Sequence, residues 1–199
     1  MAEPRSALFV IDIQNDLATD EATRIPHATR IRSAGEAILS VARKVVDSYR
    51  TKQEKSPSII VFVQHEETPE SGALVRGSTP WELVFNPRSD ISEEILVAKT
   101  VRNTFESNPD LADKLKAEGI TRISAFGIQS ECCVQEICKG ALAAGFEVTL
   151  LQGAHSTYDT GAASAVEIEK QVEDLLRSGG ATITPWRDAV AIWEKQRRM

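Results

Sequence analysis

The sequence predicts a single α/β domain in which helices cover both faces of a mainly parallel sheet. Short continuous apolar runs, typical of strands buried on both faces, alternate along the chain with segments whose apolar residues recur every three or four positions. The chain has 199 residues, a length that suits one domain, and 42% of them are hydrophobic. Strand–helix alternation implies right-handed crossovers between parallel strands.

The apolar runs and stripes give the expected elements in chain order. The predicted strands are residues 7–13, 58–64, 95–98, 122–128, 146–151 and 181–184. Apolar stripes indicate helices at 31–49, 134–142, 166–176 and 186–193. Asn108 and Pro109 are a typical helix start and Gly119 a typical stop, and Thr184 with Pro185 predicts the start of the last helix. Together these elements predict a three-layer α/β/α, Rossmann-like fold with a six-stranded sheet over residues 1–199.

One long segment interrupts the alternation. Residues 66–94 are polar, rich in Pro, Gly and Ser, and contain Trp81 and Phe85. A long irregular stretch inside a compact domain is usually functional, so we expect a lid or an assembly loop here.

Charge and composition exclude several classes of protein. The net charge of −6 and the pI near 5.2 give no basic surface for nucleic acid or anionic lipid. No apolar run approaches the roughly 18 residues of a membrane span, and the first residues do not resemble a signal peptide. We therefore expect a cytoplasmic protein whose partner is a small-molecule substrate. The chain lacks phosphate-binding glycine motifs, an HExxH motif and an Asp-x-His pair, so neither a cofactor nor a metal is expected.

Residues whose side chains could take part in catalysis or binding follow the predicted strands. Ligands of an open parallel sheet bind beyond the carboxyl ends of its strands, where Asp12, His65, Lys99 and His155 fall. Asp12 either caps a turn or is buried with a cationic partner, because burying an unpaired carboxylate is costly. Lys99 either extends to the surface or is that partner. His65 and His155 are expected as polar caps or pocket walls.

The three cysteines differ in their expected roles. Cys132, Cys133 and Cys138 lack the spacing of a zinc ribbon or a disulfide framework, so they are free thiols. Cys133 falls in the first turn of a helix, where the helix dipole favours a thiolate, and Lys99 is the nearest candidate for a cation that would lower the thiol pKa further. Cys138 lies on an apolar stripe and is expected in the core, and Cys132 is expected to be structural.

Several fragments together resemble a known family. They are Phe9-Val-Ile-Asp12-Ile-Gln-Asn-Asp16, Gly77-Ser-Thr-Pro-Trp-Glu-Leu83, Val97-Ala-Lys99-Thr-Val-Arg-Asn-Thr-Phe105, Phe126-Gly127-Ile-Gln-Ser-Glu-Cys-Cys133-Val134 and Ala141-Leu-Ala-Ala-Gly-Phe-Glu-Val148. In this order the fragments resemble the isochorismatase-like cysteine hydrolases over about residues 6 to 184. That superfamily includes nicotinamidases, N-carbamoyl-amide hydrolases and isochorismatase.

The resemblance implies a catalytic triad of Asp12, Lys99 and Cys133. The family cysteine stands six residues after the glycine and before a valine, which selects Cys133 over Cys132. The resemblance also implies a cis peptide between Ile128 and Gln129, and an oxyanion hole made by the N–H groups of Gln129 and Cys133. The expected reaction is hydrolysis of a C–N bond in a small amide, ureido or carbamoyl compound through a thioester.

The chain departs from the family pattern at three places. It has Gln64-His65-Glu66 where nicotinamidases place an Asp-x-His metal motif, so nicotinamide is not the expected substrate. Ser130 replaces a threonine, and Gln152-Gly-Ala-His155 stands where many members have Asp-Ala. Substrate contacts are expected from five residues: His65, Trp81, Phe105, Gln129 and Tyr158. The resemblance implies a homo-oligomer, a dimer or larger. An isochorismatase-type hydrolase and a catalytically silent scaffold of the same fold are the alternative functions.

Overall fold

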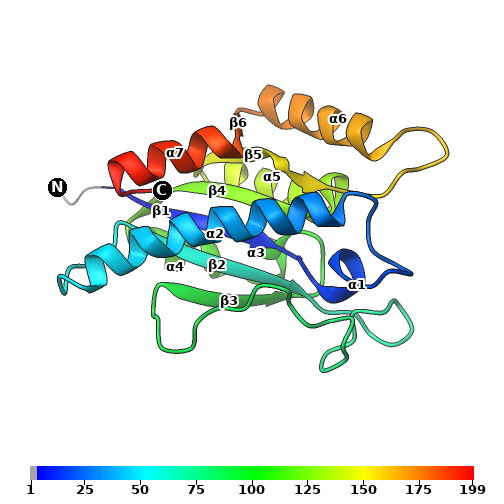
Figure 1. The fold of residues 1–199 in the computed structure, drawn as a ribbon, viewed down its shortest axis with the longest axis horizontal. Helices are drawn as coiled ribbons and strands as arrows, with labels where there is room; N and C mark the ends of the chain where they lie inside the picture. The colour runs from blue at the N-terminus through cyan, green and yellow to red at the C-terminus, as the bar shows by residue number, and fades with distance from the viewer. Residues whose placement is uncertain (1–3) are drawn as a thin grey trace.

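The sheet of the computed structural model, which describes residues 4–199, is parallel throughout. Its six strands lie in the order β3-β2-β1-β4-β5-β6 (Figure 1). The strands are β1 (Arg5–Ile11), β2 (Ser58–His65), β3 (Glu94–Lys99), β4 (Ile120–Ile128), β5 (Glu147–Ser156) and β6 (Thr182–Pro185). The predicted α/β class and six-stranded sheet are confirmed, with every strand found where an apolar run predicted one.

Helices cover both faces of this sheet. The helices are α1 (Asn15–Ala18), α2 (Ala28–Arg50), α3 (Thr104–Ser107), α4 (Leu111–Ala117), α5 (Gln135–Ala143), α6 (Ala165–Ser178) and α7 (Trp186–Gln196), with a π-helical turn η1 (Ser130–Val134) before α5. Helices α2 and α7 lie side by side on one face, and α4, α5 and α6 cover the other (Figure 1). Within residues 4–199, no helix is both long enough and apolar enough to span a membrane.

The central strand β1 separates two hydrophobic cores. Ala7, Phe9 and Ile11 face the core under α4, α5 and α6, and the alternate residues Leu8 and Val10 face the core under α2 and α7. This follows from the two-residue period of a strand, which sends successive side chains to opposite faces. Both cores leave the carboxyl end of the sheet free for polar residues.

Two predicted helix starts differ from the structure. Asn108 ends the short helix α3 instead of starting α4, because its side-chain amide donates back to the carbonyls of Ala98 and Thr104. Helix α4 begins at Leu111, after Asp110. Thr184 and Pro185 end β6, and α7 begins at Trp186 with Pro185 as its N-cap.

The irregular segment that the sequence predicts is present. Residues 66–93 contain no helix or strand, and isolated bridges attach this segment to the chain at Gln14–Leu83 and within itself at Glu67–Val75. Leu83 and Phe85 pack against the α2 side of the sheet, where Phe85 lies over Gly35. The segment therefore has one end fixed to the core and another end free to border the carboxyl edge of the sheet.

Candidate active site

Asp12 lies directly beyond the end of β1. Its backbone has a positive φ of 47°, which ends the strand, and its N–H still donates to the carbonyl of Val63 at 3.1 Å. The side chain is only 1% exposed. A carboxylate buried this deeply needs a cationic partner to remain ionised.

Lys99 is that partner. It ends β3, is 2% exposed, and its Nζ lies 2.8 Å from Oδ2 of Asp12. The same ammonium donates to Sγ of Cys133 at 3.1 Å and lies 2.9 Å from Nδ1 of His65. An ammonium has three N–H donors, and here each has a separate partner. Of the alternatives left open by the sequence, the structure shows the buried pair and not a surface lysine.

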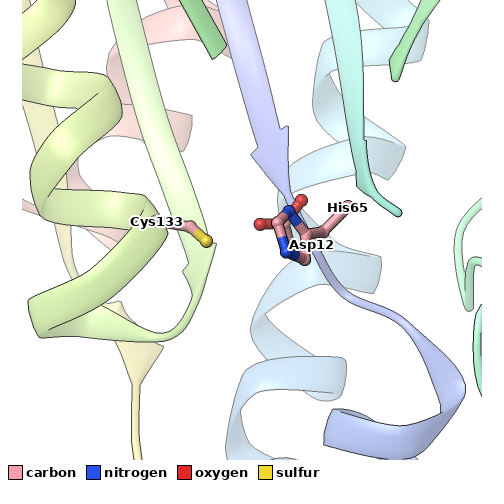
Figure 2. Close-up of side chains that lie close together, drawn as sticks. All are labelled: Asp12, His65 and Cys133. Atoms are coloured by element: carbon pink, nitrogen blue, oxygen red, sulfur yellow. The ribbon is translucent and has the colours of Figure 1, made fainter. Parts of the chain in front are cut away.

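Cys133 reaches the same point from the opposite side. It lies in η1, which follows β4, and Figure 2 shows its sulfur directed across the gap toward Asp12 and His65 at the ends of β1 and β2. The Ile128–Gln129 peptide bond before this turn is cis. Three strand ends and one turn therefore bring together Asp12, His65, Lys99 and Cys133.

The protonation of the cysteine differs from the sequence-based expectation. Burial, and then the carboxylate of Asp12, raise the pKa of the Cys133 thiol well above its ordinary range, and Lys99 only partly offsets them. The expected lowering of this pKa is therefore wrong for the unliganded site. Cys133 is a neutral thiol at rest, next to a carboxylate that can accept its proton.

Lys99 and His65, the two side chains of the site that could be cations, differ in their charge. Burial alone would lower the pKa of Lys99, but Asp12 and then Cys133 outweigh it, so the net pKa is raised and the ammonium stays charged. Burial and the charge of Lys99 lower the pKa of His65. A neutral His65 can accept a hydrogen bond at Nδ1 from the Lys99 ammonium, which agrees with the 2.9 Å contact between them.

Asp12, His65 and Cys133 also offer the donor types that a metal ion would use. One ligand atom from each lies within 4.8 Å of the others. The Lys99 ammonium contacts the same three side chains at 2.8 to 3.1 Å, so it is the cation at the centre of this cluster. A metal could bind these three ligands only if the ammonium moved away.

A cavity of about 360 Å³ opens onto this cluster. Its walls come from β1 and α1, the irregular segment, the β3–α3 connection, the β4–η1 turn and the residues after β5. The lining residues are Asp12, Asp16, Leu17, His65, Glu67, Gly72, Ala73, Leu74, Arg102, Ile128, Gln129, Cys132, Cys133 and Tyr158. Of the residues predicted to contact substrate, His65, Gln129 and Tyr158 line the cavity.

Three other predicted pocket residues lie elsewhere. Phe105 stacks on Phe9, with ring centroids 6.0 Å apart, and packs against the core because α3 turns it away from the cavity. Trp81 is not a wall residue, and its carbonyl accepts hydrogen bonds from the amides of Gln14 and Gln64. His155 is fully buried behind η1.

Several wall residues were missed by the sequence analysis. Cys132, expected to be structural, lines the cavity beside Cys133. Arg102 stands in the fragment that carries the family resemblance, and Asp16 follows β1 by a few residues, so their positions gave a usable signal. Glu67 and Leu74 come from the irregular segment, where no periodicity indicates which side chains face inward.

Comparison with known proteins matches this arrangement to one family. The family model for the isochorismatase domain matches residues 6–184. Two curated relatives are named streptothricin hydrolase, both from Streptomyces noursei, and each is 32% identical to this chain. The matches cover 82% and 79% of this chain but only 59% and 51% of the relatives, so the chain spans little more than half of their length.

Solved structures show the same fold. A cysteine hydrolase from Pseudomonas syringae pv. phaseolicola superposes with a TM-score of 0.80 at 17% identity, covering 96% of this chain and 93% of that one. An N-carbamoylsarcosine amidase from Thermoplasma acidophilum gives a TM-score of 0.64 at 20% identity, with 92% and 96% covered. Identities this low show the fold alone, but the family model extends over most of the sequence. The chain belongs to the isochorismatase family.

Proposed function

We propose that this chain is a cysteine-dependent hydrolase of a small amide, ureido or carbamoyl compound. The observation that carries the proposal is the position of the Lys99 ammonium, 2.8 Å from the Asp12 carboxylate and 3.1 Å from the Cys133 sulfur at the floor of one cavity. A nucleophile, a base and a cation that orients both are the parts that acyl transfer to a thiol requires.

The first step is proton transfer coupled to attack. Because the Cys133 thiol is neutral at rest, its proton moves to Asp12 as the sulfur attacks the substrate carbonyl carbon. The S–C bond forms while the carbonyl π electrons move to oxygen. Lys99 stabilises the sulfur as negative charge develops there, and it keeps Asp12 oriented toward the thiol.

The oxyanion that this attack produces needs hydrogen-bond donors close to the substrate oxygen. The candidates are the backbone N–H groups of Gln129, which directly precedes η1, and of Cys133, which lies within it; both residues line the cavity. Removing one such donor from other hydrolases costs about 2.7–4 kcal/mol of activation free energy. When the C–N bond breaks, Asp12 gives its proton to the departing nitrogen. The acyl group remains on Cys133 as a thioester.

Water completes the cycle. Asp12, now ionised again, takes a proton from water as the water oxygen attacks the thioester carbonyl. The C–S bond then breaks, and Asp12 returns that proton to the sulfur, which regenerates the Cys133 thiol and the Asp12 carboxylate. The substrate class agrees with the names of similar proteins, which include streptothricin hydrolase and N-carbamoylsarcosine amidase. A cavity of about 360 Å³ has room for a small molecule and not for a folded protein.

The test is a panel of small amides, ureides and carbamoyl compounds assayed for ammonia or amine release. We expect turnover by the wild-type chain and activity below a few per cent of wild type for Cys133→Ala and Asp12→Asn, with the fold intact by circular dichroism. Cys138→Ala changes a buried cysteine outside the site and controls for general damage to the fold. Full activity of Cys133→Ala would contradict the proposal.

The alternative of a silent scaffold predicts a different outcome for the thiol itself. In a working hydrolase, saturating substrate protects Cys133 from alkylation by iodoacetamide, and mass spectrometry after brief mixing detects an acyl adduct on the Cys133 peptide. A scaffold gives protection without an adduct and without ammonia. The same experiment on Cys132→Ala separates the two adjacent thiols.

A further inference from the structure

A second polar cluster lies behind the catalytic turn, outside the cavity. It joins the end of β5 to helix α6 on one side and to η1 on the other. Its hydrogen-bonded members are Ser130, Gln152, His155, Ser156, Glu169 and Glu173. None of them lines the cavity, and the mechanism above uses none of them.

A continuous chain of hydrogen bonds runs from α6 to the catalytic turn. The Nε2 of His155 lies 3.3 Å from Oε1 of Glu173, and its Nδ1 lies 2.8 Å from Oγ of Ser130. Ser130 and His155 are both completely buried. Ser130 is the first residue of η1 and directly follows Gln129, whose N–H is a candidate oxyanion donor.

The charge of Glu173 fixes the direction of these bonds. Burial would raise its pKa, but hydrogen bonds from His155 and Gln152 outweigh burial, so the pKa of Glu173 is lowered and the side chain is a carboxylate. A carboxylate can only accept, so Nε2 of His155 carries the proton. The 2.8 Å contact between Nδ1 and the Ser130 hydroxyl then joins the ring to the turn.

This arrangement resembles a Ser-His-acid triad, but burial excludes that use. The hydroxyl of Ser130 has no access to a substrate, and it faces away from the cavity toward His155. A buried polar chain of this kind is tolerated because each group has a partner, and it defines one arrangement of the backbone that it holds.

We propose that His155, oriented by Glu173, is a positioning residue that fixes the turn from Gln129 to Cys133 through Ser130. The inference rests on the proposed hydrolase function, because the turn carries both candidate oxyanion donors and the nucleophile. Oxyanion donors act only when held where the negative charge develops. A second link, from Thr157 Oγ1 to Glu131 at 2.9 Å, ties the same β5 end to the next residue of the turn.

A small aldehyde tests this role without a known substrate. The Cys133 sulfur adds to the carbonyl carbon of propanal, the C=O π bond opens, and the thiol proton moves to the new oxygen through Asp12. The thiohemiacetal places that oxygen where the substrate oxyanion would lie. Protection of Cys133 from iodoacetamide, titrated with propanal, gives the dissociation constant of the adduct.

Loss of the Ser130 hydroxyl is the central change. We expect Ser130→Ala to bind propanal about tenfold more weakly, since the donors are displaced and not removed. Ser130→Thr restores a hydroxyl and should bind within about twofold of wild type, because the bond to His155 is kept. The rate of iodoacetamide alkylation without propanal should stay the same in all three, because the thiol, Asp12 and Lys99 are unchanged.

Ser156→Ala is the matched control. Ser156 is equally buried, lies next to His155 on β5, and its hydroxyl donates to the α6 carboxylate Glu169 and not to η1. We expect propanal binding of this variant to equal that of wild type. His155→Leu should behave as Ser130→Ala does, and His155→Gln, which keeps an acceptor, should retain most of the affinity. If His155→Leu does not fold, the two Ser130 variants decide the matter.

The outcomes separate this inference from the proposed function. No propanal adduct on wild-type Cys133 would contradict the hydrolase proposal and the positioning role with it. A wild-type adduct together with unchanged binding by Ser130→Ala would overturn the positioning role alone. Equal weakening by Ser130→Ala and Ser156→Ala would also overturn it, since general loosening of β5 would then explain both.

Discussion

Single side chains determine the resting charges of the site. The carboxylate of Asp12 and the ammonium of Lys99 form an ion pair, and Cys133 keeps its proton because burial and Asp12 raise its pKa. The sequence indicated all three residues but suggested the wrong charge on sulfur. A helix N-terminus stabilises a thiolate by about 0.3–1 kcal/mol, which is small beside the cost of burying a charge next to a carboxylate.

This charge pattern predicts that Asp12→Asn changes turnover and thiol alkylation in opposite directions. Turnover should be lost because the base is gone. Alkylation of Cys133 by iodoacetamide at pH 8 should become faster, because removal of the negative charge lowers the thiol pKa while Lys99 still favours the thiolate. Alkylation rates measured from pH 6 to 10 check this, with Cys132→Ala in both backgrounds so that one thiol is followed. Slower alkylation would show that Asp12 promotes the thiolate in the resting site.

The lowered pKa of His65 predicts a pH-dependent stability. The folded chain resists protonation of His65, whereas the unfolded chain accepts a proton near the ordinary pKa of 6.5. The contribution of His65 is therefore complete above pH 6.5 and is lost as the pH falls toward the lower folded pKa. Urea unfolding at pH 7.5, 6.5 and 5.5 should show a steeper loss of unfolding free energy for wild type than for His65→Gln.

The matched control for this measurement is His27→Gln, which removes a histidine that does not line the cavity and keeps His65. We expect it to retain the steeper loss below pH 6.5. Parallel curves for wild type and His65→Gln would show that the contact between His65 and Lys99 does not hold the ring neutral.

Helices and strands could be predicted where burial leaves a recognisable pattern of apolar residues in the sequence. The inner strands β1 and β2 are apolar runs because helices cover both of their faces, and the stripe of α2 identifies a 23-residue helix. The four-residue helices α1 and α3 were missed because one turn has no period to detect. Missing α3 explains the error at Phe105, since only that turn directs the ring toward Phe9 and away from the cavity.

The surroundings of Gly72 allow a prediction about the role of the irregular segment. The Glu67 carboxylate accepts the N–H of Leu74 at 3.0 Å, and a methyl group at position 72 would meet Oε2 of Glu67 at 1.9 Å. Gly72→Ala should therefore displace Glu67 and move this wall of the cavity. We expect KM to rise several-fold, which corresponds to a loss of about 1 kcal/mol or less of binding free energy, and kcat to change little. Steady-state kinetics on the best substrate of the panel measure this split.

Gly161→Ala is the control for this substitution, because no atom lies within 4 Å of the added methyl group. It should leave KM and kcat at the wild-type values. A fall in kcat of Gly72→Ala at constant KM would place the segment in the chemical step and not in substrate binding.

On the scale of the whole molecule, the cluster around Lys99 depends on the sheet more than on the outer layers. Asp12, His65 and Lys99 follow β1, β2 and β3, which are adjacent in the sheet, and Cys133 follows β4 on the other side of β1. The strand order could not be deduced from the apolar runs alone. It decides which strand ends meet, and so it turns four separated residues into one site.

Helix α7 tests whether the site is independent of the far layer. Trp193 is 5% exposed and packs in the core under α2 and α7, whereas its neighbour Ile192 is 48% exposed. Trp193→Ala should lower the free energy of unfolding by about 3–5 kcal/mol, as large-to-small changes in cores do. Ile192→Ala should cost less than about 1 kcal/mol, because its side chain is already half in solvent.

Both variants should keep the kcat and KM of wild type once rates are corrected for the folded fraction, since α7 contributes no residue to the cavity. Chemical unfolding and kinetics on the same preparations provide both numbers. A loss of kcat in folded Trp193→Ala would mean that packing under α2 and α7 is transmitted through β1 to Asp12. The two cores would then act as one support for the ion pair, and the site would depend on both faces of the sheet.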